Sequence, residues 1–227
     1  FAALAGAIER GVQISTAARE MRSIPRPAWG AEPAARAARA LVAWAARVPA
    51  GERTRRDYVD TIQVADDLIA VMTTDDAAGL RQTIRGLRVP VFVIRTVVEE
   101  MRYDTPRIVA PLGRPIEIIF ENPDVMPHNL VVVKPGSRER LATAALGLPP
   151  EHLDRAGRAW VPESRDLVAA TKLLESGQSE TLRLPAFTEE GVYEYVCTFP
   201  GHWFVMWGQL VVTAKPDALP ANLPPAP

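Results

Sequence analysis

Three side chains that bind soft metal ions lie close together near the C-terminal end of the sequence. The segment Tyr193–Leu210, YEYVCTFPGHWFVMWGQL, contains Cys197, the only cysteine, followed by His202 and Met206. A thiolate, an imidazole and a thioether together favour copper over harder metal ions. A Pro-Gly pair directly before His202 predicts a tight and stiff turn, which would limit rearrangement of the ligands when the charge of the ion changes.

A second histidine, from a distant part of the sequence, supplies a fourth ligand. His128 lies at the edge of a strand-like run in EIIFENPDVMPHNLVVVKPG. One cysteine, two histidines and a weakly bound methionine are the ligands of copper sites that transfer single electrons. Met126 lies near His128 in the sequence and is a competing thioether. We therefore expect one copper ion held by four side chains: His128, Cys197, His202 and Met206.

These segments resemble the metal-binding segments of a known family. The motif C-T-F-P-G-H-x-x-x-M resembles the ligand loop of azurins, within the cupredoxins, and M-P-H-N-L-V-V-V resembles the segment with their first histidine ligand. ESRDLVAATKLLESGQSETLRLPAF resembles the stretch before their last strands, so the resemblance covers about residues 89–213. It implies a type 1 blue copper centre that carries electrons between redox proteins such as cytochromes. It also implies the ligand roles: equatorial for His128, Cys197 and His202, and weak axial for Met206.

Two features depart from azurins. Pro127 stands where azurins have a glycine whose carbonyl approaches the metal, which leaves a fifth contact open and resembles plastocyanin in this detail. The single cysteine excludes the internal disulfide that azurins usually carry. A periplasmic or extracellular location is therefore implied by the resemblance and not by disulfide bonds.

The resemblance and the chemistry of thiolates also predict roles for neighbouring residues. We expect the backbone N–H groups of Asn129 and Phe199 to donate hydrogen bonds to the Cys197 sulfur, and the Asn129 side chain to tie the two ligand segments together. We expect an apolar docking patch for a redox partner around the solvent-side edge of His202, unless its aromatic residues are buried in the core. The patch would consist of Met126, Pro127, Pro200, Trp203 and Phe204.

The composition is that of a globular protein with one or two domains. The 227 residues are 48% hydrophobic and 23% charged, with a formal net charge of -1, which favours neither nucleic acid nor an anionic membrane as a partner. No apolar run approaches the roughly 18 residues of a membrane span. Because the chain begins at Phe1 without a signal segment, we expect a processed or truncated product.

Residues 1–87 predict a small all-α region. Apolar side chains at helical spacing predict helices over residues 34–48 and 54–72, and a third that starts at Thr74–Asp76 and ends near Gly86. Thr54 and Asp57 are placed as a capping pair for the second helix. Residues 1–21 show no defined pattern.

The function of this helical region is not evident from its residues. It contains no histidine and no C-x-x-C-H motif, which argues against attached haem. It resembles the helical leaders that precede cupredoxin domains at the ends of large bacterial haem-containing redox proteins. We interpret it as a packing or docking appendage.

From residue 88 the pattern changes to short strands rich in Val, Ile and Phe. Seven or eight strands with turn residues between them predict a mainly β fold, a two-sheet sandwich that the resemblance makes a Greek-key cupredoxin domain over residues 88–214. The segment 135–175 is expected to be a helical insertion, with one helix at Ser137–Leu146 and a second short one after Pro150. Residues 215–227 form a proline-rich tail that we expect to be extended.

The sequence argues against an enzyme but leaves alternatives to a free electron carrier. His152, expected on the surface, is the only spare histidine and cannot build the additional His-rich centres of copper oxidases and nitrite reductases. The same four ligands would also suit a protein that carries or buffers copper. A further alternative is a copper subunit or domain docked permanently to a larger haem or quinone enzyme.

Overall fold

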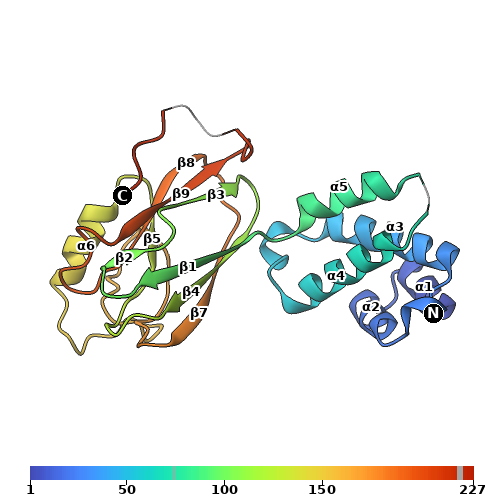
Figure 1. The fold of residues 1–227 in the computed structure, drawn as a ribbon, viewed down its shortest axis with the longest axis horizontal. Helices are drawn as coiled ribbons and strands as arrows, with labels where there is room; N and C mark the ends of the chain where they lie inside the picture. The colour runs from blue at the N-terminus through green and yellow to red at the C-terminus, as the bar shows by residue number, and fades with distance from the viewer. Residues whose placement is uncertain (74, 219–221) are drawn as a thin grey trace. The chain divides into compact units, whose positions relative to one another are not determined.

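The computed structural model describes residues 1–73, 75–218 and 222–227, and the chain divides into two compact units, residues 1–89 and 90–227 (Figure 1). Thr74, in the expected start of the third helix, and residues 219–221 of the expected tail lie outside the described residues. Among the helices of the described chain, none is both long enough and apolar enough to cross a membrane.

The first unit is all-α, as the sequence predicts. Its alanine-rich core, with Ala37, Ala38 and Ala45 fully buried, allows the helices to pack closely. Two short helices occupy the N-terminal segment for which the sequence showed no defined pattern. The described part of the unit contains α1 (Ala2–Glu9), α2 (Ile14–Arg22), η1 (Arg26–Ala28), α3 (Ala31–Arg47), η2 (Ala50–Glu52), α4 (Arg56–Ala70) and α5 (Ala77–Leu87).

The predicted capping pair of α4 is wrong. The N-cap is Arg55, which makes no side-chain capping bond, and Asp57 accepts a hydrogen bond from the N–H of Tyr58 within the first turn. The 3-10 turn η2 delays the start of the helix, so Thr54 lies before the N-cap and Asp57 lies inside the helix. Capping pairs require one specific register, which a shift of one or two residues destroys.

The second unit is a two-sheet β-sandwich, which confirms the predicted fold class. Its described residues form nine strands, one more than the upper expectation, because the segment at residues 88–104 divides in two and a further strand lies in the insertion. One sheet has the order β2-β1-β4-β7 and the other has the order β3-β9-β8-β5-β6. The strands are β1 (Val91–Val97), β2 (Arg102–Tyr103), β3 (Arg107–Pro111), β4 (Ile116–Asn122), β5 (Val131–Val133), β6 (Leu167–Ala170), β7 (Gln178–Leu184), β8 (Gly191–Val196) and β9 (Trp207–Thr213).

The core of the sandwich follows from the alternation of side chains along its strands. In β4, Ile116, Ile118 and Phe120 are fully buried, whereas the residues between them are only partly buried. They join Tyr195 and Leu210 of the opposite sheet in one hydrophobic cluster. An alternating strand that covers one side of a core is typical of a sandwich.

The insertion contains the predicted helix but not the second one. Helix α6 (Arg138–Leu146) covers the outer face of the second sheet, where Leu141 and Ala142 pack with Val131 and Val133 of β5 (Figure 1). After Pro150 the chain forms a loop instead of a helix, because the Asp154 carboxylate accepts the N–H groups of two following residues, Ala156 and Arg158. Such local hydrogen bonding competes with helix formation. Strand β6 follows this loop.

Candidate metal centre

The loop between β8 and β9 brings three of the predicted ligands together. The Cys197 N–H donates to the Met206 carbonyl at 3.0 Å, and the Met206 N–H donates to the His202 carbonyl at 2.9 Å. The His202 N–H in turn donates to the Phe199 carbonyl at 3.1 Å. Gly201 lies in the turn at φ +86°, a conformation that glycine adopts without steric cost. These backbone hydrogen bonds restrict the motion of a loop that is already short.

His128 is positioned from the other side of the site, directly before β5. Its N–H donates to the Leu174 carbonyl at 3.1 Å, and its carbonyl accepts the Leu174 N–H at 2.8 Å. This isolated antiparallel bridge fixes the backbone of a residue that lies outside the regular strands. The segment from the end of β4 to β5 therefore brings the fourth ligand to the loop described above.

The three strong donors converge on one point. The Cys197 Sγ lies 3.7 Å from His128 Nδ1 and 3.6 Å from His202 Nδ1, and the two Nδ1 atoms are 3.2 Å apart. Donor atoms bound at roughly 2.0–2.3 Å from a common ion lie about this far from one another. All three side chains are buried, and so is Met206, whereas the competing Met126 is 39% exposed. This soft and buried donor set fits a copper ion.

Burial disfavours charge on Cys197 and His202 when no cation is bound. Burial raises the pKa of Cys197 to about 12, although hydrogen bonds from the backbone N–H groups of Asn129 and Phe199 act in the opposite direction. Burial also lowers the pKa of His202, as does nearby His128, while Asp124 opposes this shift. A bound cation would favour the thiolate and the neutral imidazoles that ligate it.

Asn129 connects the two ligand segments through a residue that the sequence analysis missed. Its side chain hydrogen-bonds both the backbone N–H and the hydroxyl of Thr198, which directly follows Cys197. The Thr198 hydroxyl donates to the Trp160 carbonyl at 2.6 Å, so the insertion is joined to the same network. Nothing in the residue type of Thr198 distinguishes it from an ordinary strand threonine.

Asp124 is a second residue near the site that the sequence analysis did not identify. Its Oδ2 lies 2.9 Å from His128 Nε2, on the side of the ring away from the other ligands, and its side chain is 2% exposed. The available signal was an acidic residue four positions before the histidine in ENPDVMPH. Acidic residues at such positions are more often solvated, so composition alone did not single it out.

The residues predicted to form a docking patch differ in their exposure. Phe204 is 64% and Met126 39% exposed, and Pro127 and Pro200 are half-buried. Trp203 is buried and packs in the cluster beneath α6, so for this residue the exposed patch is wrong and the alternative, burial in the core, holds. Its carbonyl accepts a hydrogen bond from Arg138 of α6, which holds this part of the loop inward. Two apolar residues outside the prediction, Val125 and Val205, are 71% and 53% exposed.

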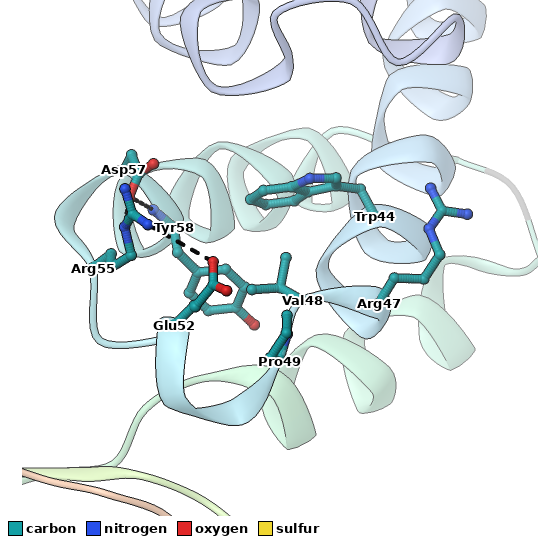
Figure 2. A pocket seen from close by; sticks show the side chains of 8 residues that line it. All are labelled: Trp44, Arg47, Val48, Pro49, Glu52, Arg55, Asp57 and Tyr58. Atoms are coloured by element: carbon teal, nitrogen blue, oxygen red, sulfur yellow. Dashed lines mark hydrogen bonds and ion pairs between the residues drawn. The ribbon is translucent and has the colours of Figure 1, made fainter.

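A pocket of the helical unit offers no metal chemistry. A cavity of about 280 Å³ lies beside the rings of Trp44 and Tyr58, near the C-terminal end of α3 (Figure 2). Arg55 on its wall forms ion pairs with Glu52 and Asp57. The cavity is lined by Trp44, Arg47, Val48, Pro49, Glu52, Arg55, Asp57 and Tyr58, without a cysteine or histidine. His152 also lies outside the cluster of metal-binding side chains found in the described residues.

Comparisons with known proteins agree with this site. The sequence model of the family described as copper binding proteins, plastocyanin/azurin family, matches residues 93–213. Auracyanin-A of Chloroflexus aurantiacus is 34% identical over 119 residues, which are 50% of this chain and 68% of that protein. Azurin of Achromobacter denitrificans is 34% identical over 89 residues, 37% of this chain and 55% of that protein. Outer membrane protein H.8 of Neisseria gonorrhoeae is 34% identical over 89 residues, 38% of this chain and 45% of that protein.

Proposed function

Because this chain belongs to the plastocyanin/azurin family of copper-binding proteins, we propose that it exchanges electrons with other redox proteins at the exposed apolar residues beside the His202 loop. The protein is a blue copper electron-transfer protein of the auracyanin/azurin kind, with a type 1 site formed by His128, Cys197, His202 and Met206. The family consists of electron carriers, which are not enzymes. The observation that carries this function is the convergence of the three strong donor atoms, all within 4.8 Å of one another.

The ligands and their neighbours suit a carrier because they are buried and held by hydrogen bonds. When bound, copper supplies a one-electron couple between Cu(II) and Cu(I). The short loop from Cys197 to Met206 and the bridge at His128 restrict movement of the donors, which keeps the reorganisation on electron transfer small. We further propose that the N–H groups of Asn129 and Phe199 stabilise charge on the Cys197 sulfur and so tune the reduction potential.

The proposed docking surface, here called the apolar rim, consists of Val125, Met126, Pro127, Pro200, Phe204 and Val205. These residues come from the segment before His128 and from the loop around His202, so they adjoin both histidine ligands in the chain. Exposed apolar side chains that are grouped in this way mark interaction sites. A small apolar contact suits an electron carrier, since it permits fast release of the partner.

A kinetic comparison tests the apolar rim. Phe204→Glu places a charge at the one aromatic side chain of the rim. It is expected to slow reduction by a c-type cytochrome about tenfold, which corresponds to a free-energy difference of roughly 1.4 kcal/mol. Reduction by a small inorganic complex should be unchanged. Val91→Glu is the control, because Val91 is also an exposed apolar residue, with 52% of its surface accessible. It lies at the start of β1, whereas the metal site is near the end of that strand, where Thr96 hydrogen-bonds Asn122. Equal rates with the cytochrome for Phe204→Glu and the unmodified protein would overturn this proposal.

We also propose a periplasmic or cell-surface location. Relatives of this chain include azurins and a protein named as an outer membrane protein, which support it. Fractionation of the producing cells, followed by detection of the chain in the periplasmic and envelope fractions, tests this location. Recovery in the cytoplasmic fraction alone would contradict it.

A further inference from the structure

Asp124 and His128 form a buried carboxylate–imidazole pair behind the metal site. The Asp124 Oδ2 and the His128 Nε2 are 2.9 Å apart, and the two side chains are 2% and 0% exposed. The other ring nitrogen, Nδ1, faces Cys197 and His202. A carboxylate accepts a hydrogen bond, so Nε2 carries the hydrogen and the lone pair of Nδ1 is free to bind a metal ion.

The second oxygen of Asp124 is fixed by the backbone of two different segments. Oδ1 accepts the Val125 N–H at 2.7 Å and the Glu99 N–H at 3.2 Å. Glu99 lies in the turn between β1 and β2 at φ 62°, a left-handed conformation that is uncommon for residues other than glycine. The carboxylate therefore joins a histidine ligand to the turn of the first sheet.

The backbone of Asp124 is held in the same way, which leaves the carboxylate little freedom. Its N–H lies 3.2 Å from Asn122 Oδ1 and 3.3 Å from Thr96 Oγ1, and the Thr96 hydroxyl donates to Asn122 Oδ1 at 2.8 Å. The Asn122 amide donates to the carbonyl of Met126 and to the carbonyl of Leu174, the bridge partner of His128. A network in which each buried group has a partner fixes one geometry.

We propose that Asp124 is a positioning residue of the copper site, which sets the tautomer of His128 and lowers the reduction potential. A carboxylate that accepts the Nε2–H makes the imidazole a stronger electron-pair donor at Nδ1. It also places a buried negative charge behind one ligand, where screening by water is weak. Both effects stabilise Cu(II), which carries the greater charge, more than Cu(I). This inference depends on the copper site and concerns how this chain tunes it.

Asp124→Asn is a sharp test because an amide cannot reproduce both sets of contacts. If the amide oxygen takes the place of Oδ1, its NH2 group faces His128 Nε2 and favours the tautomer with hydrogen on Nδ1. If the amide is turned around, its NH2 group faces the N–H groups of Val125 and Glu99. In either orientation two donors oppose each other, and a buried donor is left without an acceptor.

The expected result is a selective loss of Cu(II) binding. Asp124→Asn should weaken Cu(II) binding about 10–100-fold and Cu(I) binding less. A tenfold selective loss corresponds to a rise in the reduction potential of about 59 mV. Glu190→Gln is the control, because it removes the same charge from a carboxylate that also accepts a backbone N–H, that of Ala214. Ala214 follows the end of β9, whereas the ligand Met206 precedes its start, so this variant should leave the reduction potential unchanged. An unchanged potential in Asp124→Asn would overturn the proposal.

A measurement on the unmodified chain does not depend on whether the variant folds. In the metal-free protein, the nitrogen-15 shifts of the His128 ring should show hydrogen on Nε2 and none on Nδ1. An uncharged His128 ring with its hydrogen on Nδ1 would overturn the proposal without any need for copper. The failure of the copper site itself would look different, since the unmodified protein would then show no blue band when loaded with copper.

Discussion

Asn129 and Thr198 join the two ligand segments through a reciprocal pair of hydrogen bonds. The Thr198 N–H donates to Asn129 Oδ1 at 2.8 Å, and Asn129 Nδ2 donates to Thr198 Oγ1 at 2.9 Å. Each of the two residues directly follows a metal ligand, His128 in one case and Cys197 in the other. One side-chain contact therefore sets the separation of two ligands that are 69 positions apart in the chain.

Removal of this contact should loosen the site without removing copper. Asn129→Ala leaves the buried N–H and hydroxyl of Thr198 without their amide partner, which should lower the free energy of unfolding by roughly 1–3 kcal/mol. Loss of a residue that orients ligands should weaken copper binding about 10–100-fold. Urea unfolding and competition with a chelator measure the two effects.

Gln209→Ala is the matched control for Asn129→Ala. It removes another buried amide, whose contacts are to Arg107 and to the carbonyls of Pro224 and Pro225. We expect it to destabilise the fold but to leave copper affinity unchanged. Equal copper affinities for the two variants would show that the Asn129 contact does not hold the ligand segments together.

The close approach of Gly208 to Tyr195 makes glycine necessary in β9. These residues are paired across β8 and β9, and a Cβ added at Gly208 would lie 2.3 Å from two atoms of the Tyr195 ring. Gly208→Ala should therefore destabilise the protein by about 1–3 kcal/mol through overpacking. Gly147→Ala, where the added Cβ would meet its nearest atom at 3.5 Å, should have a much smaller effect in the same urea titration. Gly208→Ala with unaltered stability would refute this interpretation.

The loop at Asp154 predicts a specific acid dependence of stability. Burial opposes ionisation of this carboxyl, but hydrogen bonds from the Arg158 side chain and from the N–H groups of Arg158 and Ala156 hold its pKa below the ordinary value of 3.8. A lowered pKa contributes stability above the unfolded-state value, and this contribution is lost as the pH falls through the folded-state pKa. The unmodified protein should thus exceed Asp154→Asn in unfolding free energy at pH 7, and the difference should shrink below pH 3.8.

An exposed ion pair provides the comparison for Asp154. Glu163 lies 3.6 Å from Arg155, with both side chains mostly exposed, so Glu163→Gln should change stability little at any pH. A constant difference between the unmodified protein and Asp154→Asn from pH 7 to pH 2.5 would contradict the assignment of this acid dependence to Asp154.

The boundary between the two units yields another prediction. Contacts divide the chain between Val89 and Pro90, and the four ligands all lie in the second unit. We expect a polypeptide of residues 88–227 to fold and to bind copper with the same absorption spectrum as the whole chain. Residues 1–87 alone should be helical by circular dichroism and should not form the blue site. A shorter polypeptide that cannot form the blue site would show that the helical unit contributes to it.

The sequence was most informative where chemistry requires rare residues at fixed spacing. A single cysteine followed by His202 and Met206 predicts the metal centre, and alternating apolar residues predict the sandwich. Asp124 could not be recognised in this way, because its importance comes from burial opposite His128 Nε2 and not from its residue type. Such a role depends on tertiary contacts, which a sequence pattern does not show.

Local hydrogen bonding explains one of the remaining errors, and tertiary packing explains the other. After Pro150 the sequence suits a short helix, but the Asp154 carboxylate binds backbone N–H groups in a loop instead. The position of Trp203 beside His202 and Phe204 in the sequence favours a place on the surface, whereas α6 covers its side chain in the structure. The sequence shows that a helix is present but not which side chain it covers.

The most direct test of the copper site is the absorption and electron spin resonance of the copper-loaded protein beside its Cys197→Ser variant. An intense blue band arises from charge transfer between a thiolate and copper, so it depends on the Cys197 sulfur, which lies 3.6–3.7 Å from both histidine Nδ1 atoms. We expect the blue band and the type 1 resonance in the unmodified protein and neither in the variant. A variant that kept both signals, or an unmodified protein that was pale with Cu(II), would contradict the assignment.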